Sequence, residues 1–159
     1  MSFIPSDLDN YDKRILAEVQ KDARIPQGEL GLRVNLSAAA VNRRLKRLTD
    51  QHVIEKYTAV IAPNAVGYGL TIVVTVEVES EQIDLLDAMK RTFGACPQVQ
   101  QCYYVAGEWD FVLIFTVRDM DQYNALTRSL FFSNNNVKRF KTLVAMHRVK
   151  VGLDLPIDL

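Results

Sequence analysis

The spacing of apolar side chains changes near residue 70, and this change divides the chain into two parts. Before that point, apolar residues recur every three or four positions, which is typical of amphipathic helices. After it, apolar and polar residues alternate, and from Leu70 to Glu79 this alternation predicts a strand with one buried face. Pro63 to Gly69, between the two parts, contains the proline and glycines of a linker.

Three helices are predicted in the first part. The first runs from Asp7 to Ala23, with acids at its start and cations at its end, as the helix dipole favours. The second runs from Gln27 to Val34, and Gly31 within it would permit a close backbone approach. The buried face of the first helix is expected to contain Leu8, Tyr11, Ile15, Leu16 and Val19.

A short turn, Asn35 to Ser37, separates the second helix from the third. Asparagine tolerates the left-handed conformation that a helix end requires, and a serine caps the start of a helix by accepting a hydrogen bond from a backbone N–H. The third helix continues to about Leu48, and an apolar stripe along it is formed by Ala38, Val41, Leu45 and Leu48.

The opposite side of this third helix combines small side chains with cations. The chain has no net formal charge, but residues 33–56 contain six cations and two acids, and the local charge governs contact with phosphates. This layout predicts a helix-turn-helix whose recognition helix lies in a DNA major groove. An ordinary solvated cationic face is the alternative. The residues expected to contact DNA are Ser37, Ala39, Ala40, Asn42, Arg43, Arg44, Lys46 and Arg47.

The second part is predicted to have the element order β-α-β-β-α-β. This order is typical of a ferredoxin-like fold, with helices on one face of an antiparallel sheet. The chain is therefore expected to be an α+β protein with a helix-turn-helix domain at 1–62, a linker at 63–69 and a ferredoxin-like domain at 70–159. After the strand from Leu70, the predicted elements are a helix (Glu81–Phe93), two strands (Val99–Val105 and Phe111–Val117), a helix capped by Asp119, and a strand (Val137–Val149). The inward face of the helix from Glu81 is expected to contain Leu85, Leu86, Met89 and Phe93.

Composition favours a reduced, cytoplasmic protein without a metal or cofactor. Cys96 and Cys102 fit no zinc-binding spacing, and the sequence contains neither a signal peptide nor an apolar run long enough to cross a membrane. His52 and His147 are the only histidines in the sequence. His147 alternates with Ala145 and Val149 along a predicted strand, which is typical of a structural residue, and neither cysteine has an evident partner. The sequence therefore does not predict an enzyme.

Several motifs carry a resemblance that runs nearly from end to end. They are LDNYDKRIL, KDARIP and VIEKYTAVIAP in the first part, and CYYVAGEWDFVL and a closing Leu155-Pro156 in the second. On these motifs the chain resembles the Lrp/AsnC (feast/famine) family of bacterial and archaeal transcription regulators. It departs from the family at Gly31, where alanine is usual, and at Asn35 and His52, where glycine is usual.

The resemblance implies that the amino-terminal domain binds DNA and that the carboxy-terminal domain drives dimerisation and further association, commonly to octamers. It also implies that a small effector, usually an amino acid, binds between dimers near Gly107 to Asp110. An amino acid needs N–H donors for its carboxylate and an acceptor for its ammonium group. The loop Gly107, Glu108, Trp109 and Asp110 would offer both, with Asp110 as the ammonium partner, and a plain hairpin is the alternative. The opposite wall is expected to include Ser133, Asn134 and Asn136.

The expected function is that of a transcription regulator whose DNA binding responds to an amino-acid effector through oligomer assembly. A dimer would present two recognition helices to half-sites of double-stranded DNA ~34 Å apart, which predicts a palindromic operator. Siroheme decarboxylases share this two-domain build and are the enzymatic alternative, although such an enzyme would not need the cations from Arg43 to Arg47. A purely structural assembly module is the third possibility.

Overall fold

The computed structural model describes residues 8–158, which form two compact units. Among these residues, the first unit contains residues up to Val60 together with the segment that begins at Val151, and the second runs from Ile61 to Lys150. This division differs from the predicted boundaries, because the last residues belong to the helical unit and residues 63–69 to the second unit. The expected start of the first helix at Asp7 lies outside the described residues.

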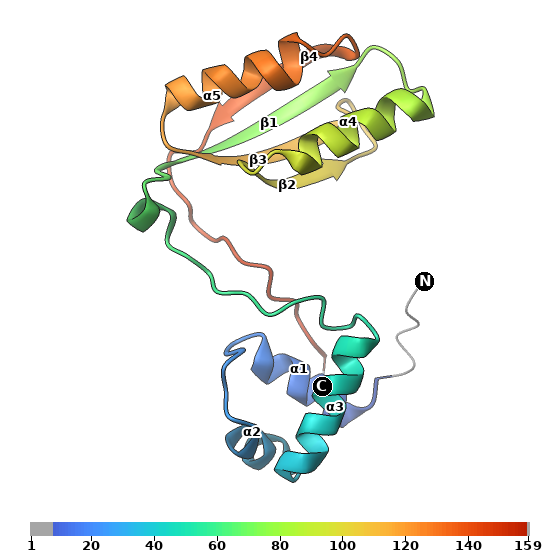
Figure 1. Cartoon of the computed structure of the whole chain (residues 1–159), viewed down its shortest axis with the longest axis vertical. Helices are drawn as coiled ribbons and strands as arrows, with labels where there is room; N and C mark the ends of the chain where they lie inside the picture. The colour runs from blue at the N-terminus through green and yellow to red at the C-terminus, as the bar shows by residue number, and fades with distance from the viewer. Residues whose placement is uncertain (1–7, 159) are drawn as a thin grey trace. The chain divides into compact units, whose positions relative to one another are not determined.

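The first unit contains the three expected helices (Figure 1). They are α1 (Asn10–Val19), α2 (Gln27–Val34) and α3 (Ala38–Asp50). The side chains that they bury together follow the helical period of the sequence and form a small separate core of Ile15, Val19, Leu30, Val34, Val41 and Leu48.

Helix α1 is shorter than predicted because a capping box fixes its start. The Asp9 carboxylate accepts a hydrogen bond from the backbone N–H of Asp12 at 2.8 Å, and the Asp12 carboxylate accepts one from the N–H of Asp9 at 3.3 Å. The buried face also differs from the prediction. Tyr11 is 41% exposed, whereas Asp12, which lies on the expected polar side, is fully buried.

The turn between α2 and α3 confirms the predicted local chemistry. Asn35 is left-handed, with φ 57° and ψ 48°, and the Ser37 hydroxyl accepts a hydrogen bond from the N–H of Ala40 at 3.2 Å. A Cβ at Gly31 would lie 2.5 Å from the carbonyl oxygen of Leu36. The close approach expected at this glycine therefore exists, and its partner is the backbone of the turn. Ala38 is exposed and does not extend the apolar stripe of α3.

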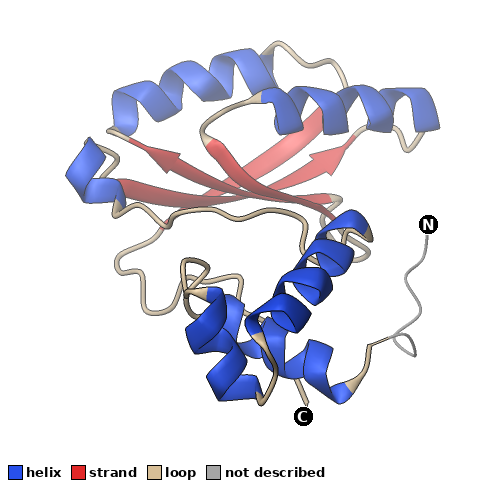
Figure 2. Ribbon diagram, turned by 60° about the horizontal axis from the view of Figure 1, so that its bottom comes forward, coloured by secondary structure: helices blue, strands red, loops and turns tan. Residues whose placement is uncertain are grey.

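The second unit confirms the predicted ferredoxin-like order. Its four strands form one antiparallel sheet in the order β2-β3-β1-β4, and both long helices cover the same face of it (Figure 2). A 3-10 turn, η2 (Pro63–Val66), precedes the sheet, and a π-helical segment, η3 (Arg128–Phe132), extends the last helix. The elements are β1 (Leu70–Val78), α4 (Ile83–Ala95), β2 (Val99–Tyr104), β3 (Phe111–Val117), α5 (Met120–Thr127) and β4 (Val137–Val144).

Two details of this unit differ from the prediction. Strand β4 ends at Val144 and not at Val149. Its last register pair with β1 is Ile72 with Val144, and one further hydrogen bond joins the N–H of Ala145 to the carbonyl oxygen of Thr71. His147 therefore lies outside the strand. Leu85, which was expected to face the core, is 39% exposed.

The two faces of the sheet have different surroundings. One face of β1 and β3 buries alternating residues such as Ile72, Val74 and Leu113 beneath α4 and α5. On the other face, Val73 lies opposite Ile114 on β3 and opposite Leu143 on β4. These side chains are apolar but incompletely buried, and Leu143 is 47% exposed. The second face therefore has an apolar strip that neither α4 nor α5 covers, next to polar positions such as Thr71 and Lys141.

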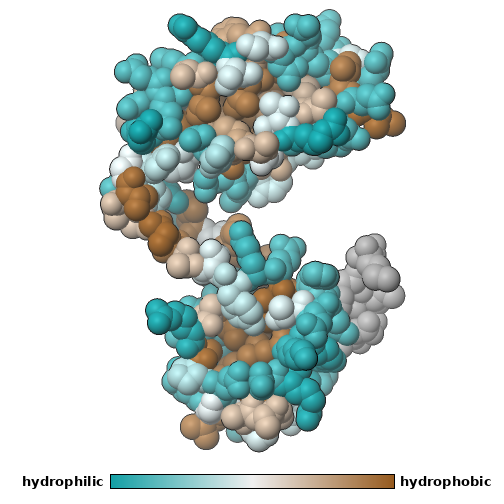
Figure 3. Space-filling model, in the orientation of Figure 1, coloured by the Kyte–Doolittle hydropathy of each residue, from teal (hydrophilic) through white to brown (hydrophobic). Residues whose placement is uncertain are grey.

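Apolar side chains are also exposed near both places where the chain passes from one unit to the other (Figure 3). They include Val60 and Ile61 on one segment and Leu153 and Leu155 on the other. Within the described residues, no helix combines the length and the hydropathy that crossing a membrane would require.

Candidate DNA-binding and effector sites

Helix α3 presents three different sides around its buried stripe. Successive residues of an α-helix turn by about 100°, so each side chain belongs to one sector of the surface. Val41 and Leu48 are fully buried and Leu45 is half-buried, which fixes the inward sector. The remaining sectors face α1, face α2 or are open.

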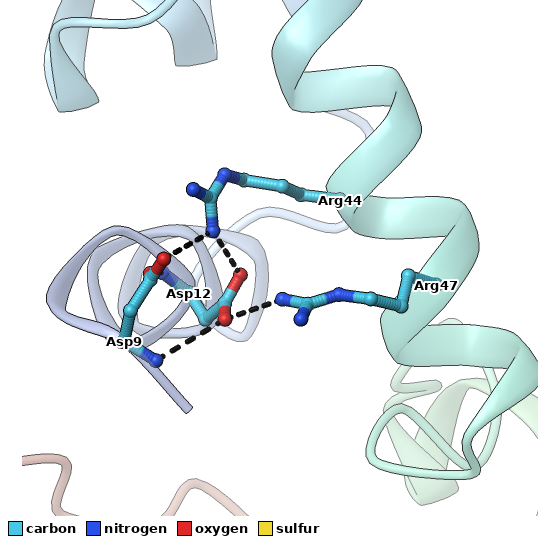
Figure 4. A network of polar contacts seen from close by, with 4 residues as sticks. All are labelled: Asp9, Asp12, Arg44 and Arg47. Atoms are coloured by element: carbon cyan, nitrogen blue, oxygen red, sulfur yellow. Dashed lines mark hydrogen bonds and ion pairs between the residues drawn. The ribbon is translucent and has the colours of Figure 1, made fainter. Parts of the chain in front are cut away.

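The sector that faces α1 carries Arg44 and Arg47 (Figure 4). Nη1 of Arg44 donates to Asp9 Oδ2 at 2.7 Å and to Asp12 Oδ1 at 2.8 Å. Nη2 of Arg47 donates to the other oxygen of Asp12 at 2.5 Å. Both oxygens of the buried Asp12 carboxylate therefore bind an arginine of α3.

This network joins α1 to α3 through charges that compensate each other. A buried carboxylate is costly unless it is paired and hydrogen-bonded, and two guanidinium groups together with a backbone N–H satisfy Asp12. The carboxylates of Asp12 and Asp9 raise the pKa of Arg44 above its ordinary value. The Arg44 guanidinium also lies 5.4 Å from the centre of the Tyr11 ring, which explains why Tyr11 stays near the surface.

The sector on the other flank of α3 contacts α2. The side-chain oxygen of Asn42 accepts a hydrogen bond from Nε2 of Gln27 at 3.2 Å. The amide group of Asn42 can still donate two hydrogen bonds, because only its oxygen is engaged. Asn42 therefore lies at the border between the α2 contact and the open surface.

The open sector lies between these two flanks and contains Ala39, Arg43 and Lys46, which are exposed. Among the described residues, neither Arg43 nor Lys46 has an ion-pair or side-chain hydrogen-bond partner. Asp50 falls on the same sector at the end of the helix, so the cationic part of the sector is its first three turns. Ser37 caps the amino terminus of the helix, and Ala40 is half-buried beside it.

The eight residues predicted to contact DNA thus separate into two groups. Ser37, Ala39, Arg43 and Lys46 belong to the open surface, with Ala40 and Asn42 at its borders. The structure engages Arg44 and Arg47 with acids of α1, and their contact with DNA stays a prediction. Their partners lie 32 to 35 residues away along the chain, so the periodicity of α3 alone gives no sign of them.

The predicted effector loop connects β2 to β3. Asp110 supports the end of the sheet here, since its Oδ2 accepts the backbone N–H of Val78 at 2.7 Å and its own N–H donates to the carbonyl oxygen of Val76 at 2.9 Å. Gly107 has φ +154°, within the range that L side chains rarely adopt, as expected of a glycine that relieves strain. One oxygen of Asp110 thus has a structural partner.

Arg139 on β4 contacts this loop and was missed by the sequence analysis. Its guanidinium lies 4.8 Å from the centre of the Trp109 ring, and Nη2 lies 3.5 Å from Glu108 Oε1. Arg139 also pairs with Glu77, its register partner on β1. Lys138 and Arg139 lower the pKa of Glu77. The signal that could have identified Arg139 is a cation on one predicted strand opposite an acid, Glu77, on the strand that pairs with it.

The side chains predicted to form the opposite wall of the effector site make hydrogen bonds mainly to nearby backbone groups. The Ser133 hydroxyl donates to the carbonyl oxygen of Arg128 at 2.8 Å, and the Asn134 side chain accepts the N–H of Asn136 at 3.0 Å. Asn136 is 6% exposed, and its amide exchanges two hydrogen bonds of 3.0 Å with the backbone of Ser80. The Asn136 side chain therefore joins the residue before β4 to the segment that follows β1, and its role in effector binding stays a prediction.

An open surface hollow of about 490 Å³ lies beside this wall. Its apolar part contains three neighbouring rings. Between ring centres, Phe131 lies 4.6 Å from Phe140 in a tilted arrangement, and Phe132 lies 5.5 Å from Phe140 edge-on. Arg139 also lines it and connects it to the loop of Trp109. The lining residues are Phe131, Phe132, Asn134, Asn135, Val137, Lys138, Arg139 and Phe140.

Known proteins resemble both units. Residues 8–55 match a family described as winged helix-turn-helix DNA-binding, and residues 71–154 match the Lrp/AsnC ligand binding domain. An uncharacterised HTH-type transcriptional regulator of Sinorhizobium fredii is 41% identical over 96% of this chain and 90% of its own length. The leucine-responsive regulatory protein of Escherichia coli is 33% identical over 91% of this chain and 88% of its own length.

A solved structure has the same fold over almost its whole length. A transcriptional regulator from Neisseria meningitidis, in complex with L-Met, superimposes with a TM-score of 0.88 at 27% identity and covers 95% of this chain and 97% of its own. Fold and site thus define a transcriptional regulator with a helix-turn-helix unit and a ligand-binding unit. The chain belongs to the Lrp/AsnC family.

Proposed function

We propose that this regulator binds a palindromic operator as a homodimer and that an amino-acid effector changes its assembly on DNA. The observation that carries the proposal is the open sector of α3, where Arg43 and Lys46 are exposed and lack partners among the described residues. An arginine can bind O6 and N7 of guanine, and a small side chain such as Ala39 can contact a thymine methyl group.

Selection from a pool of random duplexes tests the DNA-binding part of this proposal. Repeated binding to the full chain should enrich an inverted repeat with half-sites about one helical turn apart, since a two-fold symmetric dimer reads two equal half-sites. Enrichment of no sequence over the starting pool would contradict operator recognition, and enrichment of a single unrepeated site would contradict the dimeric arrangement.

We propose an amino acid with an apolar side chain as the effector. The aromatic rings beside Arg139 would accept such a side chain, and Arg139 is a suitable partner for a carboxylate. The related regulator from Neisseria meningitidis was solved with L-Met. A thermal-shift screen of the standard amino acids tests this part, because a ligand that binds only the native state raises the melting temperature. Equal melting temperatures throughout the screen would contradict it.

Homodimer formation is supported by the uncovered face of the sheet. Val73, Val112 and Ile114 form neighbouring apolar positions there, and contiguous exposed apolar surface commonly marks an interface. Thr75, opposite Val112, has a buried hydroxyl without a hydrogen-bond partner among the described residues. A second copy could cover this face with its own, as a two-fold interface requires. Further association, up to an octamer, would follow from additional contacts between dimers.

We further propose that the protein has no catalytic activity. His52 serves as a left-handed residue after α3, with φ 57°, and His147 is exposed beyond the end of β4. Within residues 8–158, neither imidazole has a side-chain hydrogen bond or an ion pair of the kind that orients a general base. The absorption spectrum of siroheme should stay unchanged when siroheme is mixed with the purified chain. A shifted spectrum together with loss of carboxyl groups from the added compound would favour the decarboxylase alternative.

A further inference from the structure

We propose that Asp12, assisted by Asp9, is a specificity-determining residue, because it withholds Arg44 and Arg47 from DNA phosphates and leaves Arg43 and Lys46 as the cations of α3 that meet the duplex. This inference rests on the proposed DNA-binding function. It assigns to an acid on α1 a role in the discrimination between operator and other DNA.

The withheld arginines lie close to the surface that would meet DNA. Arg47 follows Arg43 by four residues on α3, so their side chains are neighbours on the helix surface. The side chain of Arg47 is 42% exposed and that of Arg44 is 23% exposed. Long arginine side chains at such positions could turn outward toward a phosphate if Asp12 did not bind them.

The burial of Asp12 explains why the arginines remain with it. The Asp12 side chain is fully buried, whereas phosphates of a duplex are surrounded by water and counterions. Removing an arginine from Asp12 would leave an uncompensated buried charge, which costs more than a solvent-exposed ion pair gains. The folded protein therefore favours Asp12 over phosphate as the partner of both guanidinium groups.

Withholding cations affects operator and non-operator DNA unequally. Phosphate contacts supply nearly all of non-specific binding, whereas operator binding also uses contacts to bases. A helix with fewer phosphate-binding cations therefore loses relatively more affinity for non-operator DNA. Asp12 would thus increase the ratio of specific to non-specific affinity, the quantity that decides site occupancy in a genome.

The test measures how the affinity for a short duplex of mixed sequence depends on salt. Each phosphate neutralised adds about 0.9 to the magnitude of the slope of log K against log salt. Asp12→Asn keeps the size of the side chain and removes its charge, so this variant should bind the mixed duplex more tightly and increase the slope by about 1 to 2. Asp84→Asn removes the same charge from an exposed position of α4, outside the helical unit, and is the matched control, with a slope close to that of the unchanged chain.

A triple variant separates this effect from altered folding. Adding Arg44→Ala and Arg47→Ala to Asp12→Asn should return the slope to its original value, because the released cations are gone. Circular dichroism melting establishes that each variant is folded at the temperature of the titration. A folded Asp12→Asn with an unchanged slope would overturn the inference.

If Asp12→Asn does not fold, single arginine variants carry the test. Arg43→Ala should lower the slope by about 0.9, whereas Arg44→Ala and Arg47→Ala should leave it unchanged. Equal reductions in all three variants would overturn the inference while supporting DNA binding. Failure of the unchanged chain to bind any duplex would overturn the proposed function itself, and this inference with it.

Discussion

Two glycines of α2 occupy different environments although they are three residues apart. A Cβ at Gly31 would lie 2.5 Å from the Leu36 carbonyl oxygen, whereas a Cβ at Gly28 would have no heavy atom within 4 Å. Helix propensity alone favours alanine over glycine at an interior position by about 1 kcal/mol. The difference between the two sites must therefore come from the turn that follows α2.

Gly31→Ala should destabilise the helical unit by about 1–3 kcal/mol, because backbone atoms of the turn would have to move. Gly28→Ala is the matched control and should be neutral or stabilising by up to about 1 kcal/mol. Urea denaturation of both variants of the full chain, followed by circular dichroism, measures the difference. Equal urea midpoints for the two variants would show that the turn accommodates a Cβ at position 31 without loss of stability.

Local chemistry made some residues predictable and left others hidden. Asn35 and Ser37 follow from the rules for helix ends, which involve only neighbours in sequence. The burial of Asp12 could not be predicted in this way, because an acid in the first turn interacts with the helix dipole equally well when it is exposed. Its burial depends on Arg44 and Arg47 of another helix, and periodicity contains no information about such partners.

At the scale of elements, α1 and its neighbours are joined by ionised acids, so stability should depend on pH. Although partial burial opposes ionisation of Asp9, the N–H of Asp12 and the Arg44 guanidinium lower its pKa. Lys21 and Arg33 lower the pKa of Glu18 in the same way. A carboxylate with a lowered folded-state pKa stabilises the fold above its unfolded pKa, and this contribution is lost as the pH falls through the folded pKa.

We therefore expect the melting temperature of the helical unit to decrease as the pH falls through and below the ordinary range of carboxyl groups. Asp9→Asn should show a shallower decrease, since one of the contributing carboxylates is absent. Calorimetric scans at a series of pH values measure both curves. Parallel curves for the variant and the unchanged chain would show that the contacts of Asp9 do not stabilise the fold.

The loop between β2 and β3 allows structure and ligand binding to be separated at Asp110. Asparagine can still accept the hydrogen bond from the N–H of Val78, so Asp110→Asn should keep the stability of the sheet. Asp110→Ala loses this bond and should destabilise the unit by about 1–3 kcal/mol. If the carboxylate binds an ammonium group, Asp110→Asn should also lose the thermal shift produced by the effector. An undiminished shift in this variant would exclude Asp110 as the ammonium partner.

Elements whose pattern continues to their ends were predicted closely, and the others were not. Strand β3 has the predicted bounds, Phe111–Val117, because alternation persists along all of it. Strand β4 continues to alternate beyond Val144, yet its register pairs with β1 stop at Ile72, although β1 itself extends to Leu70. The end of a strand thus depends on hydrogen bonds to its neighbour, which sequence periodicity does not describe.

For the whole molecule, the uncovered face of the sheet predicts how assembly can be disrupted. Ile114 lies at its centre, between Val73 and Gln101, so Ile114→Glu should place a charge within the proposed dimer interface and produce monomers. Ile83→Glu is the matched control, since Ile83 is 75% exposed on α4, in the helix layer. Sedimentation velocity measures the oligomeric state of both variants. A dimer that persists in a folded Ile114→Glu variant would exclude this face as the interface.

The division into two units was predictable only in part. The change of period near Leu70 predicted two units with different architectures. The return of the carboxy-terminal segment was not visible, because it depends on paired hydrogen bonds between Gln20 and the backbone of Leu155, at 2.8 and 3.1 Å, across 135 residues. Contacts at such separation arise from the fold and leave no periodic trace in the sequence.

A titration of Arg43→Ala tests the central claim most directly. Fluorescence anisotropy with a duplex enriched from the random pool should show specific affinity weakened by roughly 1–3 kcal/mol, because Arg43 lies on the open sector of α3. The melting temperature of the Arg43→Ala variant should equal that of the unchanged chain, since Arg43 has no ion-pair partner among the described residues. Full affinity for the enriched duplex in this variant would contradict the claim that the open sector of α3 reads DNA.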